Sequence, residues 1–168
     1  MYLISYGTRP ELIKLFPLIN IFKENNIDHK TIFTGQHEDL IKEFENLTHR
    51  PDFVLEKTMK HKQSINSLIY KIINESQKII NSYDCKVIIQ GDAASSFAVA
   101  LSAFNEGKEV IHVEAGLRTH NLRSPFPEEG FRKMISHISN IHFCPTIKSV
   151  ENLKNEGITE NVHLVGNT

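Results

Sequence analysis

Short apolar runs alternate with longer amphipathic stretches along the whole chain. The apolar runs have the length of buried strands, and the stretches between them have helical spacing. We predict strands at about residues 2–6, 30–34, 86–90, 109–113, 141–144 and 162–166. We predict helices at about residues 9–25, 37–47, 64–82, 94–106, 128–140 and 147–156. Strands that alternate with helices form βαβ units, so the pattern predicts an α/β fold with a Rossmann-like, doubly wound parallel sheet.

Several predicted helix ends carry capping signals. Thr8 and Glu11 have the spacing of a capping box, and Pro10 suits the first turn of a helix. A helix that begins directly after a strand and a glycine presents backbone N–H groups to an anion. Gly107 and Gly157 fall where a glycine in the left-handed conformation ends a helix.

Composition narrows the class of protein. The chain has 168 residues, of which 40% are hydrophobic and 23% charged, as expected for one domain with a substantial core. It carries 19 basic and 20 acidic residues without a basic stripe, so we expect no nucleic-acid partner. No apolar run approaches the roughly 18 residues that cross a bilayer, and the N-terminus lacks a signal peptide, so we expect no membrane partner and a cytoplasmic location. Cys85 and Cys144 have no zinc-site spacing, so we expect no metal.

Acidic residues follow two of the predicted strands. Asp92 comes after an apolar strand and Gly91, and Glu114 ends the next strand along the chain. Glu128 and Glu129 begin a predicted helix nearby. In an open parallel sheet the ligand crevice lies outside the carboxyl ends of the strands, so acids at neighbouring strand ends point at the same space. We therefore predict a cleft suited to acid/base chemistry.

Each acid also has a structural interpretation. Asp92 has the position of an N-cap, and Glu114 has a possible ion-pair partner in Arg118. Acids in a first helical turn, such as Glu128 and Glu129, are favoured by the helix dipole. The presence of all of them around one predicted edge favours function for Asp92, Glu114 and Glu128, and we assign Glu129 a structural role.

Six segments carry motifs that are recognisable together. They are Gly7-Thr8-Arg9-Pro10-Glu11 with Lys14, Thr34-Gly35-Gln36-His37, Gln90-Gly91-Asp92, His112 to Arg118, Ser124 to Glu129, and Gly166-Asn167-Thr168. In this order they resemble the non-hydrolysing UDP-N-acetylglucosamine 2-epimerases, whose two Rossmann-like domains are arranged as in the GT-B glycosyltransferases. The chain departs from the family pattern at residues 93–96, usually a run of threonines, and at Phe131, usually an asparagine. Both departures bear on substrate preference more than on the class of reaction.

The resemblance implies a reaction and a set of residues. The reaction interconverts UDP-GlcNAc and UDP-ManNAc by loss and re-addition of UDP through 2-acetamidoglucal, without a cofactor. The implied catalytic residues are Asp92, Glu114 and Glu128, and the implied substrate-binding residues are Arg9, Lys14, Gln36, His37 and Arg118. Arg9 and Lys14 have the alternative of solvated surface groups. Gln36 matches a glutamine that contacts an activating second UDP-GlcNAc in bacterial members, but Asp39 replaces another, which leaves activation open.

The last predicted strand is followed by a glycine turn where another βα unit would normally begin. We expect residues 1–168 to form the N-terminal lobe of a two-lobed protein, with the C-terminal UDP-binding domain absent from this chain and the fragment inactive by itself. The resemblance implies a homodimer for the full-length protein, serving surface polysaccharide or capsule synthesis in a bacterium. Two alternatives remain: a hydrolysing relative that releases free N-acetylmannosamine, and a non-catalytic or glycosyltransferase lobe of the same fold. Glycosyltransferases need no set of acids around carbon C2 of the sugar, so the three carboxylates argue against a glycosyltransferase lobe.

Overall fold

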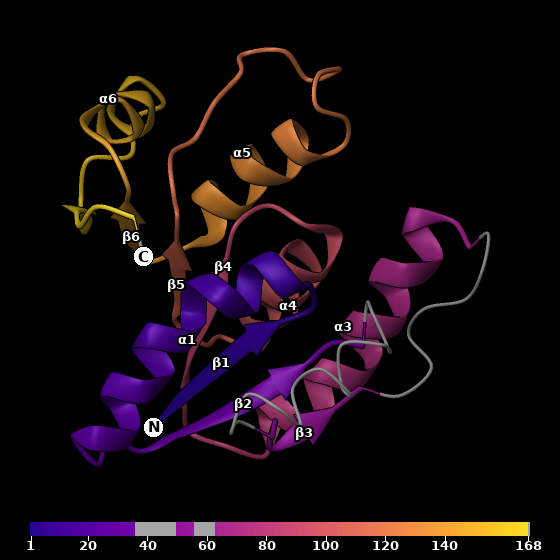
Figure 1. Ribbon diagram of the computed structural model, residues 1–168. Helices are drawn as coiled ribbons and strands as arrows, with labels where there is room; N and C mark the ends of the chain where they lie inside the picture. The colour runs from indigo at the N-terminus through magenta and orange to yellow at the C-terminus, as the bar shows by residue number, and fades with distance from the viewer. Residues whose placement is uncertain (36–49, 56–62, 168) are drawn as a thin grey trace.

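Seven parallel strands form the centre of the molecule in the computed structural model, which describes residues 1–35, 50–55 and 63–167 (Figure 1). The strands are β1 (Tyr2–Tyr6), β2 (His29–Phe33), β3 (Phe53–Val54), β4 (Lys86–Gln90), β5 (Val110–Val113), β6 (Ile141–Cys144) and β7 (Val162–Leu164). Their order in the sheet is β3-β2-β1-β4-β5-β6-β7, and each neighbouring pair is parallel. The predicted α/β class with a Rossmann-like, doubly wound sheet is therefore confirmed.

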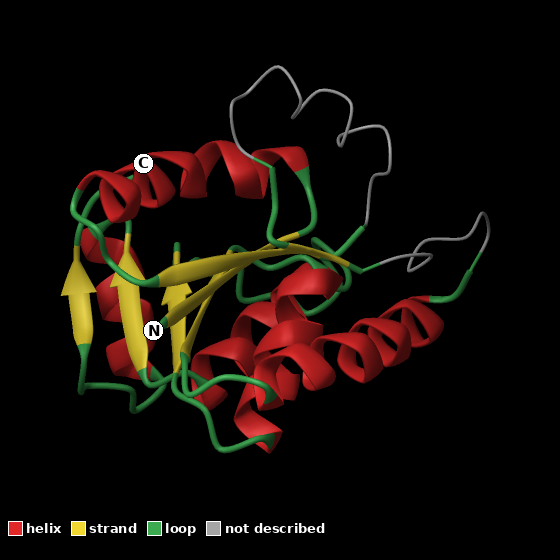
Figure 2. Cartoon of the chain, turned by 90° about the horizontal axis from the view of Figure 1, so that it is seen from below, coloured by secondary structure: helices red, strands yellow, loops and turns green. Residues whose placement is uncertain are grey.

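Helices cover both faces of this sheet (Figure 2). They are α1 (Arg9–Glu24), α3 (Ile65–Asn81), α4 (Ala94–Asn105), α5 (Glu128–Ile138) and α6 (Ile147–Asn155). The predicted helix at 37–47 lies outside the described residues. Strand β3 was not predicted, because two residues are too few to show a period.

The predicted caps are present. The Thr8 hydroxyl accepts a hydrogen bond from the Glu11 N–H, and the Glu11 carboxylate accepts one from the Thr8 N–H, which completes the capping box of α1. Gly107 and Gly157 follow α4 and α6 with φ values of +66° and +82°, in the left-handed region that glycine adopts without strain. These caps fix where each helix begins or ends relative to the strand beside it.

Two apolar clusters pack on the opposite faces of the sheet. On one face, α1 packs Leu12, Leu15 and Ile19 against residues such as Ile4 and Ile88 of the strands. On the other face, α3, α4 and α5 pack against alternate residues of the same strands; this cluster includes Leu68, Ile72, Val87, Ile89, Ala98, Val110 and Ile135. The near-continuous apolar character of β4 follows from this burial on both faces. Among the described residues, no helix has the length and apolar character to span a membrane.

The strand order reverses direction between β1 and β4, so the connections from these two strands run to opposite sides. Such a reversal opens a crevice at the carboxyl ends of the two strands. The chain is closely packed at the end of β1. A Cβ on Gly7, just after β1, would lie 2.2 Å from Thr34 Oγ1 and 2.9 Å from Ser95 Oγ. Position 7 therefore admits glycine alone, and this glycine lets the ends of β1 and β2 lie close to the start of α4.

Candidate active site

Asp92 lies directly after β4, beyond a left-handed turn. Gly91 has a φ of +73°, which turns the chain out of the strand and towards α4. The Asp92 carboxylate accepts a hydrogen bond from Arg132 Nε of α5 at 2.6 Å, and both side chains are partly buried. Arg132 was not among the residues predicted for the site. The only local signal for it is its position three residues after Glu129, within salt-bridge reach on one helix face.

Glu114 lies directly after β5, and its backbone is also left-handed, with a φ of +66°. One carboxylate oxygen is paired with Lys14 Nζ of α1, and the other accepts a hydrogen bond from the side-chain amide of Gln90 on β4. The structural alternative in which Glu114 pairs with Arg118 is wrong. Non-glycine residues rarely adopt a positive φ, and such strain is concentrated at functional sites.

The structure brings Asp92 and Glu114 to adjacent strand ends. Gln90 and Val113 are partners in the parallel register of β4 and β5, so the residues that follow them leave the sheet side by side. A Cβ placed on Gly91 would lie 3.9 Å from Glu114 Oε2. The two acids thus lie at the carboxyl edge of the sheet, next to the reversal point of the strand order. Their catalytic roles stay predictions.

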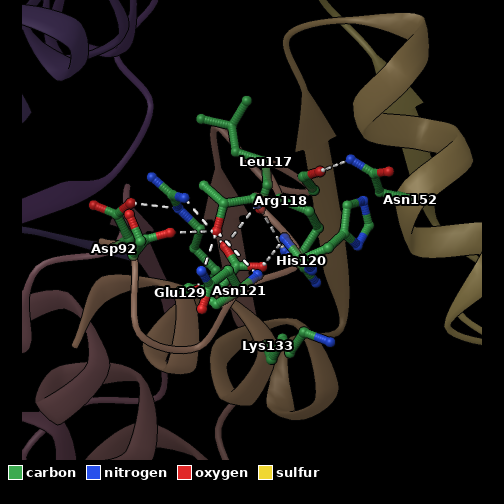
Figure 3. A network of polar contacts seen from close by, with 12 residues as sticks. Asp92, Leu117, Arg118, His120, Asn121, Glu129, Lys133 and Asn152 are labelled. Carbon is green, nitrogen blue, oxygen red and sulfur yellow. Dashed lines mark hydrogen bonds and ion pairs between the residues drawn. The ribbon is translucent and has the colours of Figure 1, made fainter. Parts of the chain in front are cut away.

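Glu129, one residue after Glu128 at the start of α5, fastens the long loop between β5 and α5 (Figure 3). Its fully buried carboxylate accepts hydrogen bonds from the backbone N–H groups of Thr119 and His120, both at 3.0 Å, and from Arg132 Nη1 at 3.2 Å. Burial acts to raise the pKa of Glu129, but these hydrogen bonds outweigh it and hold the pKa below its ordinary value. Glu129 therefore has the structural role that was assigned to it.

Arg132 connects the Glu129 network to Asp92, since one guanidinium binds both carboxylates. Burial acts to lower the pKa of Arg132, but Asp92 and Glu129 raise it overall. This bridge places the first turn of α5, and with it Glu128, beside the turn that carries Asp92. The Glu128 side chain is half-buried, and its Oε2 has no hydrogen-bond partner among the described residues. Glu128 is thus the acid of the predicted set for which no cation partner is seen in that part of the chain.

Arg118 is turned towards α6 instead of the acids. Its side chain is fully buried, and its guanidinium binds both oxygens of Glu156, at 2.9 and 2.6 Å, and the Ser136 hydroxyl at 2.9 Å. Gly116, two residues earlier, packs against α6 so closely that a Cβ would lie 2.3 Å from the Ser149 carbonyl oxygen. The predicted substrate-binding role of Arg118 therefore requires this ion pair to open. That role stays a prediction.

The remaining predicted residues lie around the start of α1. Arg9 is exposed at the first residue of that helix, and Lys14 is on its second turn, paired with Glu114. Gln36 and His37 lie outside the described residues. Glu11 is buried near the start of α1, and its carboxylate accepts hydrogen bonds from the N–H groups of Gly7 and Thr8 and from the Ser96 hydroxyl. Burial raises the pKa of Glu11, and these hydrogen bonds oppose the increase.

In the ranges that the structure covers, no three His, Cys, Asp or Glu side chains lie close enough together to hold a metal ion. The ionic groups at the carboxyl edge are instead paired acids and bases: Glu114 with Lys14, and Asp92 and Glu129 with Arg132. This arrangement can hold carboxylates in fixed orientations for proton transfer.

A doubly wound parallel sheet with cation-paired carboxylates at its carboxyl edge defines the class: an α/β protein with a cluster of ion-paired acids beside the switch point of the sheet. Comparison with known proteins gives the family. The profile of the UDP-N-acetylglucosamine 2-epimerases matches residues 20–168, and the chain belongs to this family.

Individual relatives agree with this assignment. The chain is 38% identical over 170 residues to the UDP-N-acetylglucosamine 2-epimerase of Campylobacter jejuni and 39% identical over 170 residues to that of Salmonella borreze. Each alignment covers 99% of this chain but only 44% and 45% of the relative. The chain therefore spans less than half the length of these curated relatives.

Solved structures show the same relation. The UDP-GlcNAc 2-epimerase of Neisseria meningitidis bound to UDP-GlcNAc superposes with a TM-score of 0.91 at 36% identity, over 99% of this chain and 46% of that one. The UDP-GlcNAc 2-epimerase of Methanocaldococcus jannaschii in complex with UDP-GlcNAc and UDP superposes with a TM-score of 0.90 at 36% identity, over 99% and 47%.

Proposed function

We propose that this chain supplies the acid/base residues of an epimerase that interconverts UDP-GlcNAc and UDP-ManNAc through 2-acetamidoglucal. Membership of the 2-epimerase family supports this proposal, as do the two solved relatives whose structures hold UDP-GlcNAc. The observation that carries it is the pairing of Asp92 and Glu114 with cations at adjacent strand ends, beside the switch point of the sheet.

The chemistry explains why several acids are needed. The C2 hydrogen of the sugar is not next to a carbonyl, so it is not acidic in the ground state. When the bond from C1 to UDP breaks, the developing oxocarbenium ion makes the C2 proton labile, and its loss gives 2-acetamidoglucal. Inversion then returns a proton to the opposite face of C2 before UDP adds again at C1. Two faces require at least two groups that accept and donate protons, each placed within hydrogen-bond reach of C2.

The position of the proposed groups next to rigid elements supports these roles. Asp92 and Glu114 extend from neighbouring strands, and Glu128 extends from the first turn of the helix that Arg132 joins to Asp92. Lys14 and Arg132 come from helices on opposite faces of the sheet, so Glu114 and Asp92 are each oriented by a separate cation. Sites built on strands and helices hold reacting groups more exactly than sites built on loops.

The start of α1 is the proposed place for the anionic part of the substrate. The backbone N–H groups of a first helical turn and the exposed Arg9 side chain favour a diphosphate. Lys14 would then face both the substrate and Glu114. We propose that Gln36 and His37 also bind the substrate. Because the chain spans less than half of its relatives, we propose further that a second lobe holds most of the uridine diphosphate.

Exchange of the C2 proton tests this function. The intact gene product is incubated with UDP-GlcNAc in D2O, and NMR follows deuterium at C2 and the products. We expect UDP-ManNAc with deuterium at C2 from the wild type, and no exchange from Asp92→Asn or Glu114→Gln. The matched control is Glu109→Gln, an acid that pairs with Lys86 at the opposite edge of the sheet and should leave exchange unchanged.

Two outcomes would contradict the proposal. Exchange at the wild-type rate in either acid variant would remove that acid from the reaction. Free N-acetylmannosamine in place of UDP-ManNAc would show the hydrolysing reaction instead of epimerisation.

A further inference from the structure

Strand β5 holds both backbone polar groups of Gly91, the residue directly before Asp92. The Gly91 N–H donates a hydrogen bond to the Val113 carbonyl oxygen at 3.1 Å. The Gly91 carbonyl oxygen accepts a hydrogen bond from Nε2 of His112 at 2.8 Å. Since Gly91 has a left-handed φ and would otherwise be a flexible turn, these two bonds from β5 fix the direction in which the chain leaves β4.

The reverse contact runs from β4 to the other acid. The side-chain amide of Gln90 donates a hydrogen bond to Oε2 of Glu114, and the Gln90 residue is only 3% exposed. A nearly buried amide has less freedom to move than a surface group, so it positions its partner more exactly. Each strand therefore holds the acid region of the other: β5 through His112, and β4 through Gln90.

The two holding side chains lie on opposite faces of the sheet. Side chains alternate between faces along a strand, so Gln90 shares the face of Ile88, which packs with the α1 cluster. His112 shares the face of Val110, which packs with the cluster of α3, α4 and α5. A displacement of one strand end relative to the other would therefore break a hydrogen bond on each face.

We propose that Gln90 and His112 are reciprocal positioning residues that fix the separation and orientation of the Asp92 and Glu114 carboxylates. This inference rests on the proposed function, because the separation matters for proton transfer at the two faces of C2. Neither residue is required to touch the substrate. Each acts through the acid that the opposite strand presents.

The surroundings of His112 fit a holding role and not a proton-transfer role. A carbonyl oxygen only accepts, so Nε2 carries the hydrogen in the bond to Gly91. Nδ1 is buried and has no partner within the residues that the structure describes. Burial above all, with the nearby His142 and Arg118, lowers the pKa of His112 to about 3, against the opposing effect of the Gly91 hydrogen bond. The imidazole is therefore neutral throughout the pH range in which an epimerase is assayed.

Two substitutions separate the hydrogen bond from the imidazole. Glutamine places its amide nitrogen close to where Nε2 of histidine lies, whereas asparagine places it where Nδ1 lies. In the intact gene product we expect His112→Gln to keep kcat within about threefold of the wild type, and His112→Asn to lower kcat about a hundredfold with a much smaller change in KM, as for a misplacement of roughly 1 Å. Gln90→Met, which keeps the shape but removes the donor, should behave like His112→Asn.

The pH profile and the kinetic split distinguish positioning from other roles. His112→Gln should keep the wild-type pH dependence of kcat, since the imidazole does not titrate in the reaction. Equal kcat values for His112→Gln, His112→Asn and the wild type would overturn the inference. So would a loss in His112→Gln as large as that in His112→Asn, because the imidazole itself would then be required.

A measurement without turnover separates this inference from the proposed function. Nitrogen-15 NMR of histidine-labelled protein, with the His112 signals assigned by their loss in His112→Gln, reports which ring nitrogen carries the hydrogen. We expect the Nε2–H form; the Nδ1–H form would overturn the inference whether or not the protein epimerises. A wild-type protein that shows the Nε2–H form but converts no UDP-GlcNAc would contradict the proposed function. It would then also contradict a positioning role in that reaction. The hydrogen bond between His112 and Gly91 would still be supported.

Discussion

The buried ion pair between Arg118 and Glu156 should dominate the stability of the edge formed by β5, β6 and α6. The Arg118 side chain is fully buried and that of Glu156 is 17% exposed, and both carboxylate oxygens accept hydrogen bonds from the guanidinium. Glu156→Gln keeps the size of the side chain but leaves a buried guanidinium without its counter-charge. Breaking a buried pair in this way costs roughly 3–5 kcal/mol. We expect about 3 kcal/mol, at the lower end, because Glu156 is partly reached by water and Arg118 keeps its bonds to Ser136 and Leu117.

Urea unfolding followed by circular dichroism measures this cost. With a slope of about 2 kcal/mol per molar urea, a loss of about 3 kcal/mol moves the midpoint down by about 1.5 M. The matched control is Glu151→Gln on the same helix, since Glu151 pairs with Lys148 at 3.6 Å and both side chains are more than half exposed. Such a surface pair contributes at most about 0.5 kcal/mol.

A midpoint for Glu156→Gln that falls no lower than that of Glu151→Gln would refute the reasoning. A double-mutant cycle adds a second check. Once Arg118→Met has removed the guanidinium, Glu156→Gln should cost at least about 1 kcal/mol less than it does alone, because contacting residues are not additive. Independent costs would show that the two side chains do not act as a pair.

Three further predictions follow from the site. Glu129→Gln should lower the free energy of unfolding by about 2 kcal/mol. The amide has one oxygen that can accept from Thr119 or His120, and its NH2 group faces the other N–H donor. Hydrogen exchange at the Thr119 and His120 amides should become faster, and unchanged protection would contradict the structural role of Glu129. Burial lowers the pKa of His112 to about 3, below its unfolded value near 6.5, so between these two pH values the unfolded chain binds one more proton than the folded chain. The folded state therefore has its full stability from this group above the unfolded pKa and loses it as the pH falls. Between pH 7 and pH 5 the wild type should therefore lose about 2 kcal/mol more than His112→Gln in urea unfolding, and parallel losses would show that His112 is accessible to protons. Finally, the 168-residue chain alone should show no epimerisation and no C2 exchange, because binding of the remote uridine diphosphate supplies the positioning on which bond cleavage depends; turnover by this chain would disprove the need for a second lobe.

The sequence predicted most elements because their signals are local. Each predicted strand in the described ranges lies within two residues of the observed one, since runs such as Val87 to Ile89 are apolar on both faces and are bounded by polar residues. The capping box at Thr8 and the glycine ends of α4 and α6 were predicted for the same reason. Strand β3 was missed because its two residues carry no pattern of their own. It pairs with β2, and the Asp52 carboxylate next to it accepts hydrogen bonds from the Thr31 N–H and hydroxyl.

The acids of the site were predictable, but their partners were not. Asp92 and Glu114 each follow an apolar run, so the edge at which they lie follows from the direction of the strands. Lys14 is 100 positions away from Glu114, and Arg132 is 40 positions away from Asp92. Such pairs depend on how helices pack over the sheet, which no local period encodes. Arg118 shows the converse case: it belongs to a motif, yet α6 supplies the carboxylate that holds it.

In the proposed reaction, the order of the strands brings two acids from different βα units to one sugar. Because β4 and β5 are neighbours in parallel register, the turns after them leave the sheet at the same level, and each strand end can be held by a side chain of the other. The cations then arrive from opposite faces, Lys14 from α1 and Arg132 from α5. The carboxylates of Asp92 and Glu114 therefore have a backbone that is fixed by the sheet and an orientation that is fixed by the helices. The proposed proton transfer at two faces of one carbon needs this independence, since a single flexible acid would have to move around the ring between the two steps.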